Sequence, residues 1–299
     1  MSQTNTVTET NEGRTPLLPL LLLGAIVGVL PLLVYMQLVT FDGIAGEIYG
    51  PSLQGNLFSY IKTVWLYILT AAAMWWFRCN RQARPNWYHQ PLVVYSFLVI
   101  VSTIFAEHRQ MALWGDPHRH EGMFAHLCYM AIVYLIINLI NSDYEIKFLT
   151  TALLLSATLL SLLGVAQFFG YDYLYSDWAE SLFVAKHIHK LLPGIDFKQM
   201  QNNAHSIFLT FGNGNFTGSY MAMVLAFTLP LSLLWKSRGR WLLIALDLLL
   251  LVNLLGSKSR AGLLGLVVAT FFAALLLRRV IRANLRLTAF ILVCCLLTP

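Results

Sequence analysis

Charged residues are scarce in this sequence. Asp, Glu, Lys and Arg make up 11% of the 299 residues, whereas hydrophobic residues make up 58%. Soluble domains usually carry about 25% charged residues. Long apolar runs recur along the whole chain, so the composition excludes an ordinary soluble enzyme and predicts a protein that crosses a membrane several times.

Cysteine is also rare, and its spacing excludes two kinds of site. The four cysteines are Cys79, Cys128, Cys294 and Cys295, and they form no CxxC pair. None lies in a segment that we expect to be exported. We interpret them as apolar filler rather than as disulfides or metal ligands.

About nine apolar segments predict an all-α, polytopic membrane helical bundle. The predicted spans are 16–38, 59–77, 91–106, 123–140, 148–169, 216–235, 241–256, 261–277 and 287–299. No small-residue cleavage site follows the first segment, so it is predicted to be retained rather than removed as a signal peptide. The last is shorter than the ~20 residues of a complete span, and we expect the sequence to be a fragment of a longer protein.

The polar residues 1–15 predict a disordered cytoplasmic tail, and 16–299 a transmembrane helical domain. A cytoplasmic N-terminus puts the dense Lys and Arg clusters at 78–84, 236–240 and 278–286 on the inner side, where positive charge near span ends is favoured. Orientation and contact with anionic lipids explain these clusters. The net charge of +6 therefore predicts membrane lipids as partners and no nucleic acid.

Two cations oppose this trend. Lys258 and Arg260 lie in LLGSKSRAGLLGL, within an apolar run, and mark a turn at the outer face between the seventh and eighth spans. Gly256 and Gly262 are expected to permit that turn. A plain surface hairpin is the alternative, but a cation retained against the trend is a candidate site. Arg260 is the stronger candidate, because a guanidinium can bind phosphate through two parallel hydrogen bonds.

One long outer loop is predicted at about 170–215. Within it, WAESLFVAKHIHKLL at 178–192 predicts an interfacial amphipathic helix. At the end of the loop, GNGN at 212–215 precedes the sixth span. Glycine and Asn at a helix start leave backbone N–H groups to bind an anion, so Asn213 and Asn215 are candidate substrate-binding residues. The alternative is a turn with Asn215 or Thr217 as the N-cap.

A second group of polar residues lies in WGDPHRHEGMF, 114–124, in the outer loop before the fourth span. Arg119 and Glu121 are candidates for an anion-binding arginine and its orienting carboxylate. A solvated loop is the alternative. His118 and His120 also suggest a metal site, but their spacing is not that of HExxH.

Asp247 is an acid within a predicted span, which is by default a functional hypothesis. Arg240 is seven residues earlier and on the same helix face. We favour a structural pair between these two residues near the inner interface.

Three of these stretches together resemble one family. GNGNFTGSYMAMVLAFTLPL resembles a "GNPN-F-aGy" helix start, KSRAGLLGL resembles "SRGAWLGL", and WGDPHRHEGMF resembles "G-yRyeGl". These motifs occur in the O-antigen ligase and polymerase family, bacterial membrane glycosyltransferases that use polyprenyl-diphosphate-linked glycans. The likeness covers roughly residues 110–280.

The resemblance implies a GT-C-like enzyme of the bacterial inner membrane, with a cavity that opens outward. Arg260, with Arg119, would hold and stabilise the lipid diphosphate, with Lys258, Glu121, Asn213 and Asn215 as substrate-binding residues. The glycan would pass to a glycan, lipid or protein acceptor. No cofactor and no metal is expected, because the donor is already activated.

The sequence departs from the family pattern at two places. Gly214 replaces the proline of GNPN. Many members have an arginine a few residues before that motif; here the nearest candidate cation is His205, which is a further candidate substrate-binding residue. The resemblance also implies a general base, a histidine in an exported loop beyond residue 299.

Two other functions remain open alternatives. The first is a transporter or flippase of a lipid-linked glycan or small solute, although no internal repeat typical of transporters is visible. The second is a non-catalytic membrane scaffold or receptor.

Overall fold

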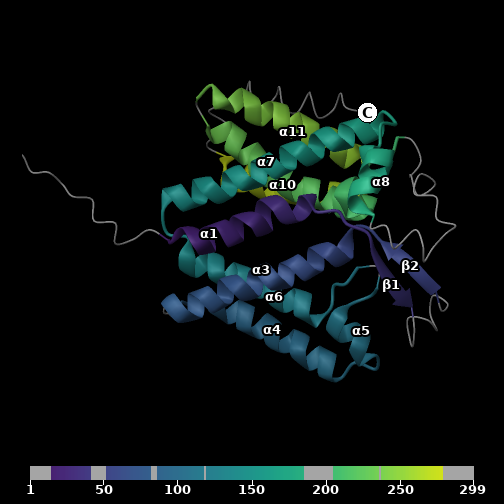
Figure 1. The fold of residues 1–299 in the computed structure, drawn as a ribbon. Coiled ribbons are helices and arrows are strands. Elements are labelled where there is room, and N and C mark those ends of the chain that lie inside the picture. The colour runs from purple at the N-terminus through teal and green to yellow at the C-terminus, as the bar shows by residue number, and fades with distance from the viewer. Residues whose placement is uncertain are drawn as a thin grey trace, which may run out of the picture. The chain divides into compact units, whose positions relative to one another are not determined.

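The computed structural model describes residues 15–41, 52–81, 86–117, 119–184, 205–235 and 237–278. Helices dominate this part of the chain (Figure 1). They occupy eight of the nine predicted spans, and the ninth, 287–299, lies outside the described residues, as does the predicted tail at 1–14. The longer α-helices are α3 (Ser59–Asn80), α4 (His89–Ile104), α6 (Met123–Leu139), α7 (Asp143–Phe168), α10 (Gly214–Leu234), α11 (Gly239–Gly256) and α12 (Arg260–Leu276).

The first predicted span, 16–38, is too long. Helix α1 (Leu17–Gly24) continues through a π-helical turn, η1 (Ala25–Val29), and a 3₁₀ turn, η2 (Leu30–Leu32). The chain then leaves the helix and forms β1 (Gln37–Phe41), which pairs with β2 (Ser52–Asn56) in a two-stranded sheet. Pro31 lacks a backbone N–H and so ends the regular helical ladder.

The predicted amphipathic helix 178–192 is also shorter than expected within the described residues. Helix α8 (Asp177–Phe183) ends where Val184 takes an extended conformation. The Phe183 carbonyl accepts a hydrogen bond from Met36 N (2.9 Å), and Val184 is buried. Tertiary contacts therefore override the helical periodicity at this point. The remainder of the predicted helix lies outside the described residues.

The chain forms two compact units. The first lies within Met1–Leu30, Phe41–Ser52 and Lys62–Leu153, and the second within Pro31–Thr40, Leu53–Ile61 and Leu154–Pro299. The first unit contains α5 (Arg109–Trp114) in addition to α4 and α6 (Figure 1). The second contains the short turns η3 (Tyr173–Tyr175) and η5 (Leu209–Phe211).

The core of the first unit joins α1, α3 and α6. Its buried side chains are Leu23, Ala73, Phe77, Leu135 and Leu139. The start of α1 is tied down by the fully buried Glu145, whose carboxylate accepts hydrogen bonds from the N–H groups of Thr15 (2.6 Å), Asn141 (2.7 Å) and Ser142 (2.9 Å). Three donors compensate for the loss of hydration of this carboxylate.

The second unit is built around α10, which packs against α11 and α12. Asn253 of α11 is fully buried and donates to the Ser161 carbonyl of α7 (3.0 Å) as well as to the Leu249 carbonyl of its own helix (2.8 Å). A methyl group on Gly164 would lie 1.8 Å from Asn253 Oδ1. The glycine therefore allows α7 and α11 to approach closely at this amide.

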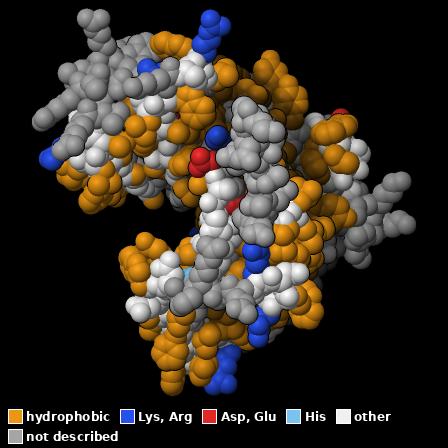
Figure 2. Space-filling view, turned by 90° about the vertical axis from the view of Figure 1, so that its left-hand side faces the viewer, with side chains coloured by type: hydrophobic (Ala, Val, Ile, Leu, Met, Phe, Trp, Pro, Cys, Tyr) orange, Lys and Arg blue, Asp and Glu red, His pale blue; other side chains and the backbone are white. Residues whose placement is uncertain are grey.

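Large apolar side chains are exposed along several helices. On α12 they recur at helical spacing, with Leu264, Val267, Phe271 and Leu275 all more than half exposed. Figure 2 shows hydrophobic side chains over much of the described surface in view. Patches of this extent are rare on soluble monomers. Within the described residues, three helices, α7, α10 and α11, are long and apolar enough to cross a membrane by length and composition.

Candidate functional site

The GNGN segment and the SKSRAG turn, far apart in the sequence, meet in the second unit. A methyl group on Gly218 of α10 would lie 2.3 Å from Ser259 Cβ, and one on Gly262 of α12 would lie 2.7 Å from the Gly218 carbonyl carbon and oxygen. Side chains larger than glycine therefore do not fit between the first turns of α10 and α12. The two helices begin at the same end of the unit, with their N-termini adjacent.

Lys258 and Arg260 lie at this junction. Arg260 is the first residue of α12 and is exposed, and the preceding Ser259 caps the helix by accepting the Gly262 N–H (3.1 Å). Arg260 forms no hydrogen bond or ion pair with the described part of the chain. Its guanidinium is therefore open to a ligand.

The turn differs from the one that we predicted. The left-handed residue is Lys258 (φ 55°), and not a glycine. Gly256 is instead buried, and a methyl group on it would lie 2.5 Å from Ile207 Cδ1. The glycines thus permit close packing, while a lysine carries the unfavourable backbone conformation. Such strain often occurs at functional sites.

The segment before GNGN is hydrogen-bonded to the end of α11 and to the turn before α12. Its Ile207 is fully buried and donates its N–H to the Gly256 carbonyl at the end of α11 (3.0 Å). Lys258 Nζ donates to Ser206 Oγ (3.1 Å). His205 is exposed, has a positive φ of 65°, and packs its ring edge-on against Phe168 (centroids 5.6 Å apart).

Gln167, near the end of α7, holds this segment in place. Its side-chain oxygen accepts the N–H groups of Phe208 (3.3 Å) and Leu209 (2.9 Å), and its amide donates to Asp172 Oδ1 (3.1 Å). Burial raises the pKa of the Asp172 carboxyl, and the hydrogen bonds from Gln167 and from the Leu174 N–H oppose that shift. Gln167 was not among the predicted site residues, because nothing in its local sequence marks it.

Asn213 and Asn215 occupy the start of α10. Asn213 is the N-cap, and its side chain accepts the Asn215 N–H (2.8 Å). The prediction of Asn215 or Thr217 as the cap is therefore wrong; Thr217 donates to the Phe208 carbonyl (2.8 Å). A methyl group on Gly214 would lie 2.4 Å from the Ser257 carbonyl oxygen. The glycine at this position, where the family pattern has a proline, therefore leaves room for the turn between α11 and α12.

We call this arrangement the cationic corner: Lys258, Arg260 and the first turns of α10 and α12. Each helix N-terminus carries a partial positive charge and leaves backbone N–H groups unpaired within the helix. Two such ends beside a lysine and an arginine favour an anion with several oxygens. Phosphate and diphosphate groups have this chemistry.

Arg119 and Glu121 belong to the first unit, whereas the cationic corner belongs to the second. Both are exposed. They lie in a tight loop between α5 and α6, in which Arg119 N donates to the Asp116 carbonyl (2.9 Å). His118 lies outside the described residues. Among the residues that the structure does describe, no three His, Cys, Asp or Glu side chains are grouped to hold a metal.

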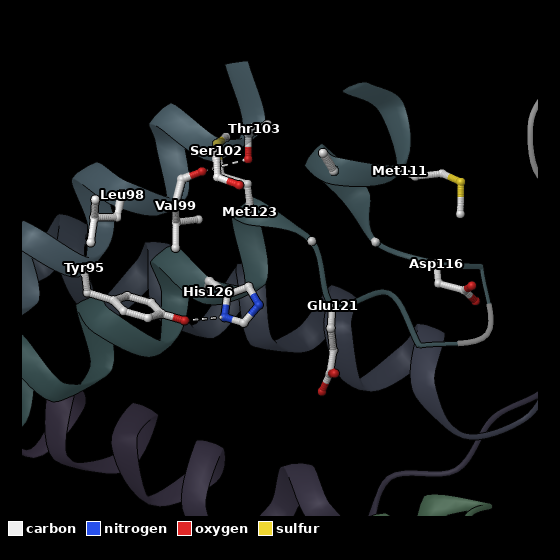
Figure 3. A pocket seen from close by; sticks show the side chains of 13 residues that line it. Tyr95, Leu98, Val99, Ser102, Thr103, Met111, Asp116, Glu121, Met123 and His126 are labelled. Carbon is white, nitrogen blue, oxygen red and sulfur yellow. Dashed lines mark hydrogen bonds between the residues drawn. The ribbon is translucent and has the colours of Figure 1, made fainter. Parts of the chain in front are cut away.

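The first unit also contains a pocket of about 600 Å³ that no motif in the sequence predicts. Glu121 lines it together with Tyr95 of α4 and His126 of α6. The Tyr95 hydroxyl and His126 Nδ1 are hydrogen-bonded, 3.1 Å apart (Figure 3). Arg119 is not one of the lining residues. The pocket therefore combines Glu121 with different partners from those predicted.

The predicted pair between Asp247 and Arg240 is wrong. Arg240 donates to the carbonyls of Trp235 and Leu233, which end α10. Asp247 is buried on α11, opposite the hydroxyls of Thr228 and Ser232 on α10. Both hydroxyls donate to carbonyls of their own helix, and the Asp247 oxygens receive no hydrogen bond from the described residues.

Comparisons with protein-family models, with curated proteins and with solved structures find no match for this chain.

Proposed function

We propose that this protein transfers a glycan from a polyprenyl-diphosphate-linked donor to an acceptor, as an O-antigen ligase or polymerase does. The observation that supports this most is the cationic corner, because it unites two of the three stretches that resemble that family. Gly218 and Gly262 are in contact there, and Lys258 and Arg260 lie beside two helix N-termini.

In this proposal the cationic corner binds the diphosphate of the donor. Arg260 holds two phosphate oxygens through its planar guanidinium, while Lys258 contributes a point charge. Breaking the bond between the sugar and the diphosphate leaves additional negative charge on the leaving group. Cations and helix N-termini already oriented toward that charge stabilise it as it develops.

The proposal places the protein in the bacterial inner membrane as a multi-pass protein with a cytoplasmic N-terminus. The cationic corner then faces outward, where lipid-linked glycans are transferred. The exposed apolar faces of α4 and α12 support burial in lipid. The acceptor is a glycan, a lipid or a protein, reached without a cofactor.

The test uses the natural protein, purified and reconstituted in liposomes with a donor whose glycan and polyprenyl diphosphate are both labelled. Transfer releases free polyprenyl diphosphate and adds the glycan label to the acceptor. A flippase would instead move the intact donor between leaflets without releasing diphosphate. Movement of intact donor, or neither event, would contradict the proposal.

A further inference from the structure

The pocket of the first unit has a chemistry opposite to that of the cationic corner. Its volume is about 600 Å³, and its walls come from α4, α5, α6 and the loop between α5 and α6. The lining includes two carboxylates, Asp116 and Glu121, and none of its lining residues in the described part of the chain is Lys or Arg. We call it the carboxylate pocket.

The loop between α5 and α6 is closely packed, which fixes the backbone that carries Asp116 and Glu121. A methyl group on Gly115 would lie 2.3 Å from Glu121 N, and one on Gly122 would lie 2.4 Å from the Leu113 carbonyl oxygen. Gly115 also has φ 90°, which disfavours other residues. Trp114 and Phe124 pack together at the base of the loop, with ring centroids 4.8 Å apart.

Glu121 has the features expected of a ligand-binding carboxylate. It lines the pocket and is exposed, and its oxygens form no hydrogen bond or ion pair within the part of the chain that the structure describes. In the view of Figure 3 it lies between the Tyr95–His126 pair and Asp116. A positively charged group bound there would neutralise it at short range.

The rest of the pocket suits a hydroxyl-rich ring. The Tyr95 hydroxyl holds the His126 imidazole through Nδ1 (3.1 Å), which orients the ring and leaves its second nitrogen for another partner. Ser102 adds a hydroxyl to the lining, and Leu98 and Met111 add apolar surface. Hydroxyl and imidazole groups bind sugar hydroxyls, and apolar side chains pack against the C–H face of a sugar ring.

We propose that the carboxylate pocket binds an amine-bearing sugar ring of the acceptor, with the ammonium group on Glu121 and the hydroxyls on Ser102 and His126. The identification of this ligand as part of the acceptor rests on the proposed function. The sign of its charge rests on the lining residues alone. An anionic ligand, such as the donor diphosphate, is repelled here and attracted at the cationic corner.

The test compares three sugars that share one type of ring and differ in charge: one cationic, one neutral and one anionic. The probes are the methyl glycosides of glucosamine, glucose and glucuronic acid, measured by calorimetric titration of the purified, natural protein in nanodiscs. The amine is expected to bind on the order of ten-fold more tightly than the neutral sugar, because a hydrogen bond to a charged group is the stronger kind. The uronic acid is expected to bind most weakly. The preference for the amine should decrease as salt is added.

The variant Glu121→Gln keeps the size of the side chain and removes its charge. It is expected to weaken binding of the amine on the order of ten-fold, to the level of the neutral sugar, while affinity for the neutral sugar stays within about two-fold. Glu107→Gln is the matched control, since Glu107 is exposed between α4 and α5 and does not line the pocket. It should bind all three probes as the unmodified protein does.

Three results would overturn this inference: equal or tighter binding of the uronic acid, equal binding of the neutral sugar and the amine, or unchanged amine binding in Glu121→Gln. The probe series on the unmodified protein needs no variant to fold. Loss of glycan transfer with intact amine selectivity would reject the proposed function but retain the pocket's preference for cations. Intact transfer without amine selectivity would do the reverse.

Discussion

The contact between the first turns of α10 and α12 gives a sharp prediction for Gly218→Ala. The added methyl group would lie 2.3 Å from Ser259 Cβ and 2.7 Å from Ser259 Oγ. Neither atom can rotate away easily, because Ser259 Oγ accepts the Gly262 N–H and caps α12. The start of α12, which carries Arg260, must therefore shift away from α10.

Gly265→Ala is the matched control, because Gly265 is also in a helix and a methyl group on it meets nothing within 4 Å. Both variants gain the same intrinsic helix preference of alanine over glycine, about 1 kcal/mol. That gain cancels in the comparison. The difference between them isolates overpacking, which typically destabilises by about 1–3 kcal/mol.

The assay measures the free energy of unfolding of both variants in mixed micelles by SDS titration, together with binding of a short-chain prenyl diphosphate. Gly218→Ala should be the less stable by about 1–3 kcal/mol and should bind the diphosphate more weakly, because Arg260 has moved. Gly265→Ala should bind it as the unmodified protein does. Equal stability and equal binding for the two variants would refute the contact between α10 and α12.

Three further predictions concern individual residues. Lys258→Gly should stabilise the protein by about 1 kcal/mol, because glycine adopts positive φ without strain, yet weaken diphosphate binding; a loss of stability would contradict the turn. Gln167→Ala should lower the free energy of unfolding by about 2–4 kcal/mol, since two backbone N–H groups and Asp172 lose a partner. Gln90→Ala, at an exposed position of α4, is the control and should leave the free energy of unfolding unchanged. Asp247→Asn should leave both stability and transfer close to normal, because the carboxylate forms no ion pair with the described residues; loss of transfer would show that its charge is used.

Much of the helical framework could be predicted from the sequence, because long apolar runs leave few alternatives to helices in a membrane. Helices α6, α7 and α11 begin or end close to the predicted limits. The two glycine-rich motifs that the sequence marked as candidate sites, GNGN and SKSRAG, both contribute to the cationic corner. What the sequence conveyed there was the identity of the residues, and not the contacts between Gly218, Ser259 and Gly262.

Three of the failures share one cause, which is contact between residues distant in the chain. Val184 leaves its helix because the backbone next to it pairs with Met36. Asp247 lies opposite hydroxyls from α10, which the spacing along α11 does not reveal. The carboxylate pocket depends on how α4, α5 and α6 pack, and no local motif relates Tyr95 to His126.

Binding of a lipid diphosphate at Arg260 is the most direct test of the account, because binding of the donor needs neither an acceptor nor a general base. The measurement is the dissociation constant for geranyl diphosphate, with the exposed Arg78 of α3 as the control position. Arg260→Ala should weaken binding about ten- to one-hundred-fold, and Arg260→Lys should restore only part of it, since the second hydrogen bond of the guanidinium is lost. Arg78→Ala should have no effect. Unchanged affinity in Arg260→Ala would contradict the central claim.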